Sequence, residues 1–201
     1  MNPAPGQVGR PRSAEADEAI RNATIAEFAE RGYDGLRIEA VAERAGVAKT
    51  TLYRRFPCKA DLVQHALSKH SEEVACPHSD SLEDDLFKLA VRLRDKFARD
   101  TLGRAIPALL DAAARHDDLR VIHRRFMAER RSSGLRRIGA AIDDGELPGD
   151  ADSEMMLDQL SATVFFRSFV WKGDLGEEEL RRLVARVLAG AMVHSRPAPS
   201  R

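Results

Sequence analysis

The sequence is short of the features that mark several large classes of protein. Cys58 and Cys76 are the only cysteines among its 201 residues, which excludes a disulfide framework and fits a reducing compartment. No apolar stretch approaches the roughly 20 residues that a membrane span requires. The N-terminal segment MNPAPGQVGRPRSAEADEA has no apolar run of the kind found in signal peptides. We therefore expect a soluble, cytoplasmic protein with no membrane partner.

The chain also has no net charge and few aromatic residues. Lys and Arg together number 32, as do Asp and Glu, so the formal net charge is zero, and aromatic residues make up 5% of the chain. A polyanionic partner would therefore have to bind a local group of cations. Ala and Leu are frequent, and they favour helices because they lose little side-chain entropy there. Because no alternating run is long enough for a strand, we predict an all-α fold.

The motifs of common enzymes are absent too. The sequence has no G-x-S-x-G, no glycine-rich phosphate loop and no H-E-x-x-H, and its histidines have no obvious nucleophile partner. We predict that the protein is not an enzyme and needs no cofactor. The alternatives of a different class are an enzyme of another kind and a helical adaptor that binds protein through its first three helices.

Apolar spacing and helix-breaking residues divide the chain into an arm and a series of helices. Residues 1–12 are rich in Pro and Gly, and we interpret them as a flexible arm. Ser13 can cap a first helix that ends at Gly32, and a short second helix ends at Gly46. A third helix ends before Pro57, and a fourth follows it. Later helices are predicted near residues 82–100, 103–116, 118–143, 152–171 and 176–193.

The stretch VAKTTLYRRF, residues 47–56, has an unusual surface for this chain. It carries three cations, two threonines and a tyrosine, but no carboxylate. If Leu52 is buried, helical spacing puts Phe56 on the same side and points Thr50 and Arg54 outward. Phosphates and base edges accept hydrogen bonds from such side chains. A short helix, a glycine-containing turn and a cationic helix have the layout of a helix-turn-helix, although an ordinary solvated face is the alternative.

The segment IEAVAERAGVAKTTLYRRFPCKADLVQHAL strongly resembles the DNA-binding segment of TetR-family transcriptional regulators. The matching frame runs from about Ala19 to Leu67. The resemblance implies that Tyr53 and Lys59 contact phosphate. It also implies a recognition helix, and the candidate DNA-binding residues are Arg37, Lys49, Thr50, Thr51, Tyr53, Arg54, Arg55 and Lys59.

Two positions depart from the family pattern. The family usually has Thr or Ser where this chain has Arg37, and it often has Ser where this chain has Ala48. Arg37 cannot cap the second helix, although its side chain can reach phosphate.

The resemblance also implies a role for the rest of the chain. In the family the C-terminal helices form a ligand pocket and a dimer interface, and the segments GRAIPALLDAAARHDDL and GELPGDADSE look like one C-terminal subclass. We therefore divide the chain into the arm 1–12, a helix-turn-helix domain 13–57 and a helical regulatory and dimerisation domain 58–201. The expected partners are double-stranded operator DNA, an unidentified small-molecule effector and a second copy of the chain. The expected function is that of a repressor released from a palindromic operator by the effector.

Helix 152–171 is apolar on more than one face, and helix 176–193 repeats the pattern. One apolar face can serve the core, so the surplus predicts contact with a partner subunit. The alternative is a central helix that is buried on all sides within one subunit. The candidate interface residues are Met156, Leu160, Val164, Leu183, Val184, Val187 and Ala191.

Candidate pocket residues combine apolar groups with a few polar ones, as small-molecule sites do. The alternative for each of them is ordinary core packing. The candidates are Arg104, His123, Phe126, Met127, Phe165, Phe166, Phe169 and Trp171, with His116 as a further polar anchor.

Two further hypotheses concern metal and redox sensing. His70, Cys76, His78 and Asp80 lie close together in the sequence, but their spacing matches no standard zinc pattern, so we predict no metal site. Cys58 at a helix N-terminus beside Lys59 is a candidate redox-sensitive thiol, and a Ser-like capping role is the alternative. A metal- or redox-responsive regulator therefore stays open as a variant of the same function.

Overall fold

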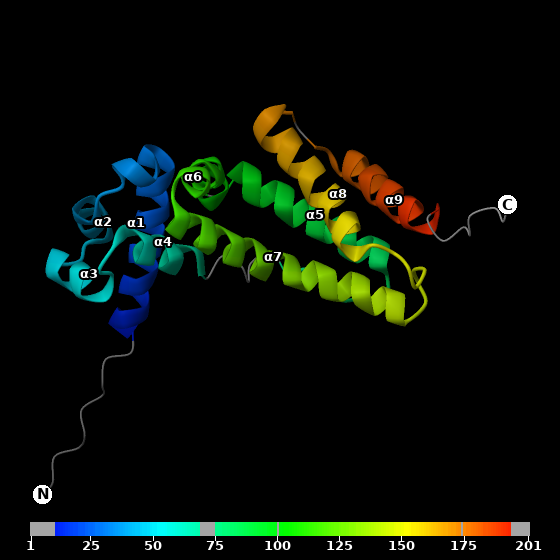
Figure 1. The fold of residues 1–201 in the computed structure, drawn as a ribbon, viewed down its shortest axis with the longest axis horizontal. Helices are drawn as coiled ribbons and strands as arrows, with labels where there is room; N and C mark the ends of the chain where they lie inside the picture. The colour runs from blue at the N-terminus through cyan, green and yellow to red at the C-terminus, as the bar shows by residue number, and fades with distance from the viewer. Residues whose placement is uncertain (1–10, 69–74, 100, 174, 194–201) are drawn as a thin grey trace, which may run out of the picture.

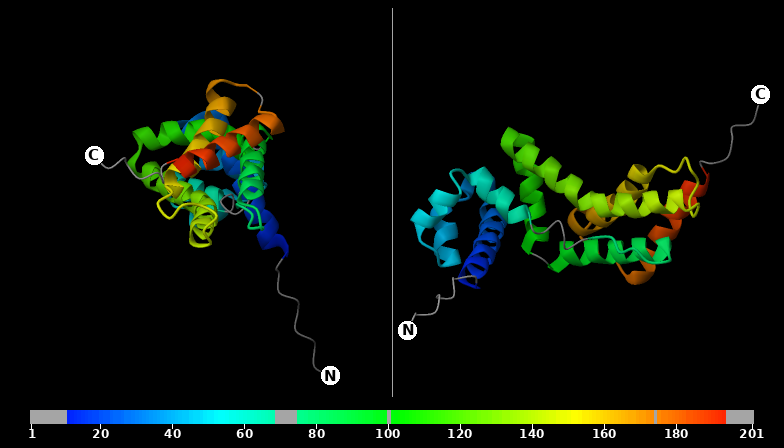
Figure 2. Two further views of the ribbon diagram at one scale, coloured as in Figure 1. Left: turned by 90° about the vertical axis from the view of Figure 1, so that its right-hand side faces the viewer. Right: turned by 90° about the horizontal axis from the view of Figure 1, so that it is seen from below.

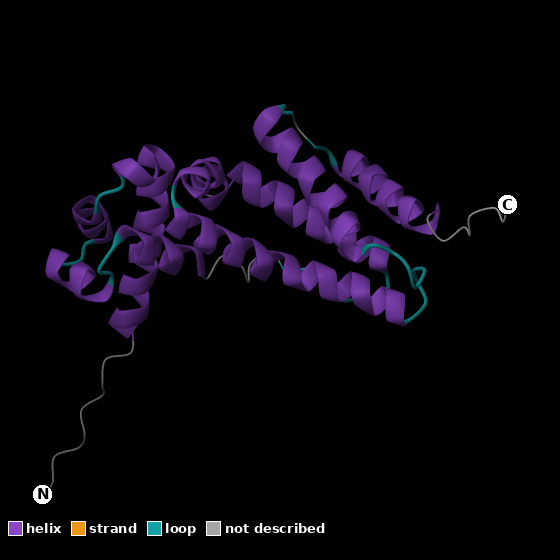
Figure 3. Cartoon of the chain, viewed as in Figure 1, coloured by secondary structure: helices purple, strands orange, loops and turns teal. Residues whose placement is uncertain are grey.

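The computed structural model describes residues 11–68, 75–99, 101–173 and 175–193, and every regular element within them is a helix (Figure 3). The predicted all-α class is therefore confirmed. None of the helices in these ranges is long and apolar enough to cross a membrane. Residues 1–10 of the predicted arm lie outside the described residues.

The first four helices form a compact unit at one end of the molecule (Figure 1). The first helix is interrupted at its predicted end, because Gly32 adopts the non-helical angles φ +67° and ψ −175°, and a short segment that runs to Gly35 follows this kink within α1. A buried apolar cluster joins the four helices, with Ile20, Phe28, Leu36, Val41, Leu52 and Leu62 among its members. The helices are α1 (Pro11–Gly35), α2 (Ile38–Ala45), α3 (Lys49–Arg55) and α4 (Lys59–Ser68).

The remaining helices lie close to their predicted positions. The one clear difference is at the end of helix 152–171, where the α-helix changes to a π-helical turn and the Trp171 N–H bonds to the Phe166 carbonyl at 2.9 Å. The elements are α5 (Leu82–Arg99), α6 (Thr101–Arg115), α7 (Asp117–Asp143), α8 (Ser153–Phe165), the π-helical turn η2 (Phe166–Val170) and α9 (Glu177–Val193).

The molecule is elongated, with α1–α4 at one end and α8 and α9 toward the other, and α7 runs along much of its length (Figures 1 and 2). Two apolar clusters form the core. The first includes residues of α6 and the start of α7, such as Leu109 and Leu119, together with the N-terminal helices. The second joins α5, the rest of α7, α8 and α9. The predicted division between residues 57 and 58 cuts through the first cluster, since Leu62 and Val63 of α4 belong to it.

The residues predicted to face a partner subunit lie mainly inside the second cluster. Leu160, Val164 and Val184 are fully buried, and only Leu183 among the seven candidates is half-buried. A side chain with no exposed surface cannot contact a partner, so these assignments need correction. The surplus apolar face of α8 is covered by α5 and α9 of the same chain. The buried candidates are Met156, Leu160, Val164, Val184, Val187 and Ala191.

A buried ion pair and a glycine fix how α7 packs. Arg137 donates from Nε to Asp85 Oδ2 of α5 at 2.6 Å, and both side chains are almost fully buried. Asp85 also accepts hydrogen bonds from the backbone N–H and the hydroxyl of Ser79, each at 2.8 Å. A Cβ at Gly134 would lie 2.9 Å from Leu157 of α8, so the glycine allows α7 and α8 to approach closely.

Candidate DNA-binding surface and ligand cavity

The turn between α2 and α3 depends on Gly46. This residue adopts φ +65° and ψ +30°, a left-handed conformation that favours glycine, and its N–H bonds to the Ala42 and Glu43 carbonyls. The Val47 N–H also bonds to the Ala42 carbonyl at 3.0 Å, which completes the cap of α2. The turn places α3 across the compact unit with Leu52 and Phe56 buried, as their spacing predicts.

The outward face of α3 is cationic and available to a ligand. Lys49, Thr50 and Arg54 are exposed, and Thr51 is half-buried. Within the described residues, the Lys49, Thr50 and Arg54 side chains form no hydrogen bond or salt bridge. Donors held on a protruding helix without protein partners are free to bond to phosphates or base edges.

Tyr53 of α3 and Arg37 at the N-cap of α2 lie near the carboxylate of Glu39. The Tyr53 hydroxyl donates to Glu39 of α2, and this hydrogen bond raises the pKa of Tyr53 above its usual value. A phosphate that bonds to this hydroxyl would therefore have to replace Glu39 as its acceptor. Arg37 is exposed at the N-cap of α2 and makes no capping hydrogen bond, which leaves its guanidinium able to reach outward.

The structure turns two predicted DNA contacts toward the protein. Arg55 bonds through Nη2 to Asp17 of α1 and lies over the Phe56 ring, 5.1 Å from its centroid. Lys59 donates from Nζ to the backbone carbonyl of Asp34 at 3.1 Å. Arg55 therefore holds α3 against α1 in the absence of DNA. Lys59 keeps two further N–H donors for a phosphate.

A cavity of about 320 Å³ lies between α5, α6, α7 and α8. Its wall is mostly apolar, with a polar part formed by α7 and α8. Of the thirteen lining residues that the sequence analysis missed, six come from α5 and α6 and seven from α7 and α8. Nothing in the local sequence pattern separates a cavity wall from ordinary core. The lining comprises Leu89, Leu93, Phe97, Ile106, Leu109, Leu110, His123, Phe126, Met127, Arg130, Arg131, Gly134, Leu157, Asp158, Ser161, Ala162 and Phe165.

Four of the eight predicted pocket residues line this cavity, namely His123, Phe126, Met127 and Phe165. The others do not. Arg104 is exposed on α6, while Phe166 and Trp171 are exposed near η2, with 71% of Trp171 accessible. Phe169 packs with its ring centroid 5.1 Å from that of Phe97 and 4.9 Å from that of Phe165, outside the lining. Their positions on helices could be predicted, but not the direction in which each faces.

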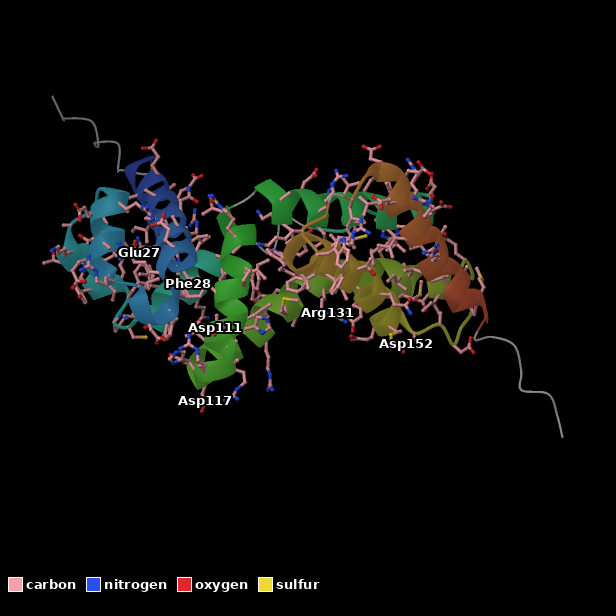
Figure 4. All side chains as sticks on the ribbon, turned by 90° about the horizontal axis from the view of Figure 1, so that it is seen from above. Glu27, Phe28, Asp111, Asp117, Arg131 and Asp152 are labelled. Carbon is pink, nitrogen blue, oxygen red and sulfur yellow. The ribbon has the colours of Figure 1, made fainter. Side chains whose placement is uncertain are left out.

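The polar part of the cavity is organised around Arg131, which lies on α7 (Figure 4). Its guanidinium bonds to Asp158 and, at 2.5 Å, to Glu154, both of α8. Arg130 lies over the Phe126 ring at 5.2 Å from its centroid. Burial lowers the pKa of His123 below its usual value, so its imidazole is uncharged at neutral pH.

The residues considered for metal or redox sensing lie outside the cavity lining. Among the described residues no group of three could hold a metal ion, and His70 lies outside those residues. Burial raises the pKa of the Cys76 thiol to about 11, which opposes the thiolate form that reacts with oxidants. The Cys58 thiol donates to Asp61 Oδ2 at 3.1 Å, so it does not cap α4 in the manner of a serine.

A polar junction joins the α6–α7 corner to the end of α1. Asp34 accepts from Arg115 Nη1 at 2.6 Å, and His116 Nε2 lies 3.1 Å from the same carboxylate. Tyr33 donates its hydroxyl to Asp118 at 2.9 Å and stacks edge-on against His116. Because Lys59 bonds to the Asp34 carbonyl, this junction also reaches the start of α4. His116, proposed as a pocket anchor, therefore belongs to the junction.

Comparison with known proteins gives two family matches. Residues 20–66 match "Bacterial regulatory proteins, tetR family", and residues 76–187 match "Tetracyclin repressor-like, C-terminal domain". The chain is 28% identical over 189 residues to the uncharacterized HTH-type transcriptional regulator YdeS of Bacillus subtilis, covering 93% of this chain and 95% of the relative.

Two further comparisons extend over most of the chain. The DNA-binding transcriptional repressor TetR of Mycobacteroides abscessus is 31% identical over 163 residues, which cover 78% of this chain and 83% of the relative. The crystal structure of the TetR family transcription regulator SCO0332 matches with a TM-score of 0.69 and 26% identity, covering 88% of this chain and 98% of that one. These matches agree with the helix-turn-helix geometry described above.

Proposed function

The chain belongs to the TetR family of bacterial transcriptional regulators, and we propose that it is a ligand-responsive repressor that binds a palindromic operator as a homodimer in the cytoplasm. The observation that carries the DNA contact is the exposed face of α3, where Lys49, Thr50 and Arg54 have no side-chain partner among the described residues. Thr50 and Arg54 point furthest from the buried Leu52 and are the candidates for base contacts. Tyr53, Lys49, Arg37 and Lys59 are the candidates for phosphate contacts.

The effector would bind in the cavity between α5 and α8. The cavity shares α6 and α7 with the polar junction at Asp34, so a ligand that shifts these helices would also move α1 and α4. Ligand binding and DNA binding would then be coupled in both directions, with a coupling of roughly 1–3 kcal/mol being ordinary.

The dimer would use the exposed faces of α8 and α9 rather than the buried positions named from the sequence. Five of the nine large exposed hydrophobic residues in the described chain lie on α8, α9 or the turn after α8. On α8 and η2 the exposed residues Met155, Gln159, Phe166 and Val170 follow helical spacing. On α9 they are continued by Ala185, Ala189 and Met192. Two such helices from each subunit would make a four-helix interface about a two-fold axis.

The test of the DNA contact is a binding selection on random duplexes, followed by affinity measurements over a salt series. Arg54→Ala should cost about 1–3 kcal/mol on the selected site and relax discrimination at the bases it contacts. Lys59→Ala should weaken binding to all duplexes alike. It should also reduce the magnitude of the slope of log affinity against log salt concentration by about one unit per subunit. If Arg54→Ala lowers the affinity for the selected duplex and for a scrambled duplex equally, α3 contacts phosphate and does not read bases. If it lowers neither affinity, α3 is not the DNA-binding surface.

A further inference from the structure

The charges around the cavity between α5, α6, α7 and α8 cancel. Arg130 and Arg131 each bring a guanidinium group to the lining, and the carboxylates of Asp158 and Glu154 both pair with Arg131. Arg130 lies over the Phe126 ring and has a further interaction within the protein. Among the described residues, two positive charges therefore meet two negative charges, and the cavity offers a ligand no net charge.

An ionic ligand would lose its hydration in this cavity without gaining a counter-charge. Twelve of the seventeen lining residues have no polar side-chain group, so the wall can solvate an ion only weakly. A carboxylate would have to take Arg131 from the two acidic side chains that already bind it, and an ammonium group would have to take one of these acids from Arg131. Either exchange leaves a charge of the protein without its partner, which is unfavourable in apolar surroundings. The lining therefore favours an uncharged ligand.

His123 of α7 supplies a polar group that the protein itself does not use. Its ring lines the cavity and is half-buried, and it forms no hydrogen bond or ion pair with any of the described residues. Burial is the cause of its lowered pKa, so the uncharged ring offers one N–H donor and one acceptor nitrogen at neutral pH. The hydroxyl of Ser161, by contrast, already donates to the Leu157 carbonyl within α8.

We propose that the cavity binds an apolar alcohol, with its hydroxyl group bonded to His123 and its hydrocarbon part packed against the leucine and phenylalanine side chains. The proposal rests on the effector-binding role of the cavity and names the chemical class of the effector. A hydroxyl group both donates and accepts hydrogen bonds, so it can pair with either ring nitrogen of His123. A largely apolar wall with one such group matches a ligand that has one polar group.

The size of the cavity limits the length of the alcohol. A volume of about 320 Å³ holds on the order of ten non-hydrogen atoms when each takes roughly the 30 Å³ that a water molecule occupies in the liquid. 1-Octanol has about this size, and octanoate and octylammonium share its chain. These three molecules differ mainly in the charge of the head group, so they form a matched set of probes.

The experiment is calorimetric titration of the full-length protein with 1-octanol, octanoate and octylammonium at neutral pH, without DNA. 1-Octanol is expected to bind about 10- to 100-fold more tightly than either ion, because a charge without a counter-charge is far more costly to bury than a hydrogen-bonded hydroxyl group. Binding of either ion as tight as that of 1-octanol, or no binding of any probe, would overturn the proposed class.

Three variants locate the hydroxyl group. His123→Phe keeps an apolar ring of similar size but no hydrogen-bonding group, so it should weaken 1-octanol binding about 3- to 10-fold, the factor for one neutral hydrogen bond. His123→Gln keeps a donor and an acceptor and should retain most of the affinity. Arg124→Gln, an exposed arginine of the same helix that does not line the cavity, should leave the affinity unchanged. Circular dichroism checks that each variant folds. If folded His123→Phe binds 1-octanol as tightly as the unchanged protein, the hydroxyl group does not bond there and the assignment is wrong.

The operator affinity of the same preparations separates this proposal from the regulator function. If DNA binding is intact but 1-octanol is not preferred over the two ions, the effector class is wrong and the regulator function stands. If the preference is present but no duplex is selected, the alcohol site stands and the DNA-binding proposal fails.

Discussion

The buried pair of Asp85 and Arg137 is the clearest case in which single side chains hold two helices together. Burial alone raises the pKa of Asp85, but the hydrogen bonds from Ser79 and Arg137 outweigh it and leave the pKa below its ordinary value. A carboxylate with a lowered folded-state pKa stabilises the protein above the pKa of the unfolded chain. That contribution is lost as the pH falls through the folded-state pKa.

We therefore expect Asp85→Asn to lower the free energy of unfolding by about 3 kcal/mol at pH 7, because the buried Arg137 loses its closer charge partner and keeps only the carboxylate of Glu146, 3.6 Å from its Nη2. The difference from the unchanged protein should shrink as the pH falls below about 4, where the carboxyl group of the unfolded chain becomes protonated. Urea unfolding followed by circular dichroism measures both effects. The control is Asp84→Asn, whose exposed pair with Arg181 at 3.7 Å should contribute little. A difference that does not depend on pH would contradict this account.

At the level of helices, the junction between the α6–α7 corner and the end of α1 is expected to control the start of α4. Asp34→Ala removes the acceptor of Arg115 and the carboxylate beside His116. Because these groups are exposed, global stability should change little. Amide hydrogen exchange should nevertheless become faster at the α6–α7 corner, where the contacts are lost, and at the first turn of α4, because the Asp34 backbone carbonyl that accepts from Lys59 is then held less firmly.

The matched control for this prediction is Asp111→Ala. Asp111 also pairs with Arg115, but within α6, so its loss should leave exchange at α4 unchanged. Equal acceleration in both variants would show that Arg115 acts through α6 alone. Faster exchange spread evenly along the chain would show that Asp34 supports general stability rather than the junction.

The helices could be predicted from apolar spacing and helix-breaking residues, but their mutual orientation could not. Spacing within α3 placed Leu52 and Phe56 inside and Arg54 outside. It could not reveal that Arg55 turns to Asp17, a residue 38 positions earlier in the chain. The pairing of Asp85 with Arg137, 52 positions apart, was hidden for the same reason. Half of the pocket candidates lie outside the cavity lining, because a residue's position on a helix gives no sign of which neighbouring element its side chain faces.

For the whole molecule, the question is why α8 has apolar residues on several sides. The sequence indicated a partner subunit, and the structure buries Val164 and Leu160 against the same chain. What remains exposed is a second, less apolar strip on α8, η2 and α9. The proposed dimer therefore depends on exposed residues that are not part of the subunit core. A substitution at one of them should weaken dimerisation without unfolding the subunit.

Ala189→Arg and Val164→Arg should accordingly affect different properties, dimerisation in the first variant and folding in the second. Ala189 is exposed on α9, so its arginine variant should fold but weaken the dimer by at least about 100-fold, since a charge at the centre of an interface costs several kcal/mol. Val164 is fully buried, so its variant should lose helicity itself. Val121→Arg, at a side chain 68% exposed on α7, is the control that should change neither property. Sedimentation at micromolar concentration, with circular dichroism on the same samples, distinguishes these outcomes. An unchanged protein that sediments as a monomer, or an Ala189→Arg variant that stays dimeric, would remove α8 and α9 as the interface.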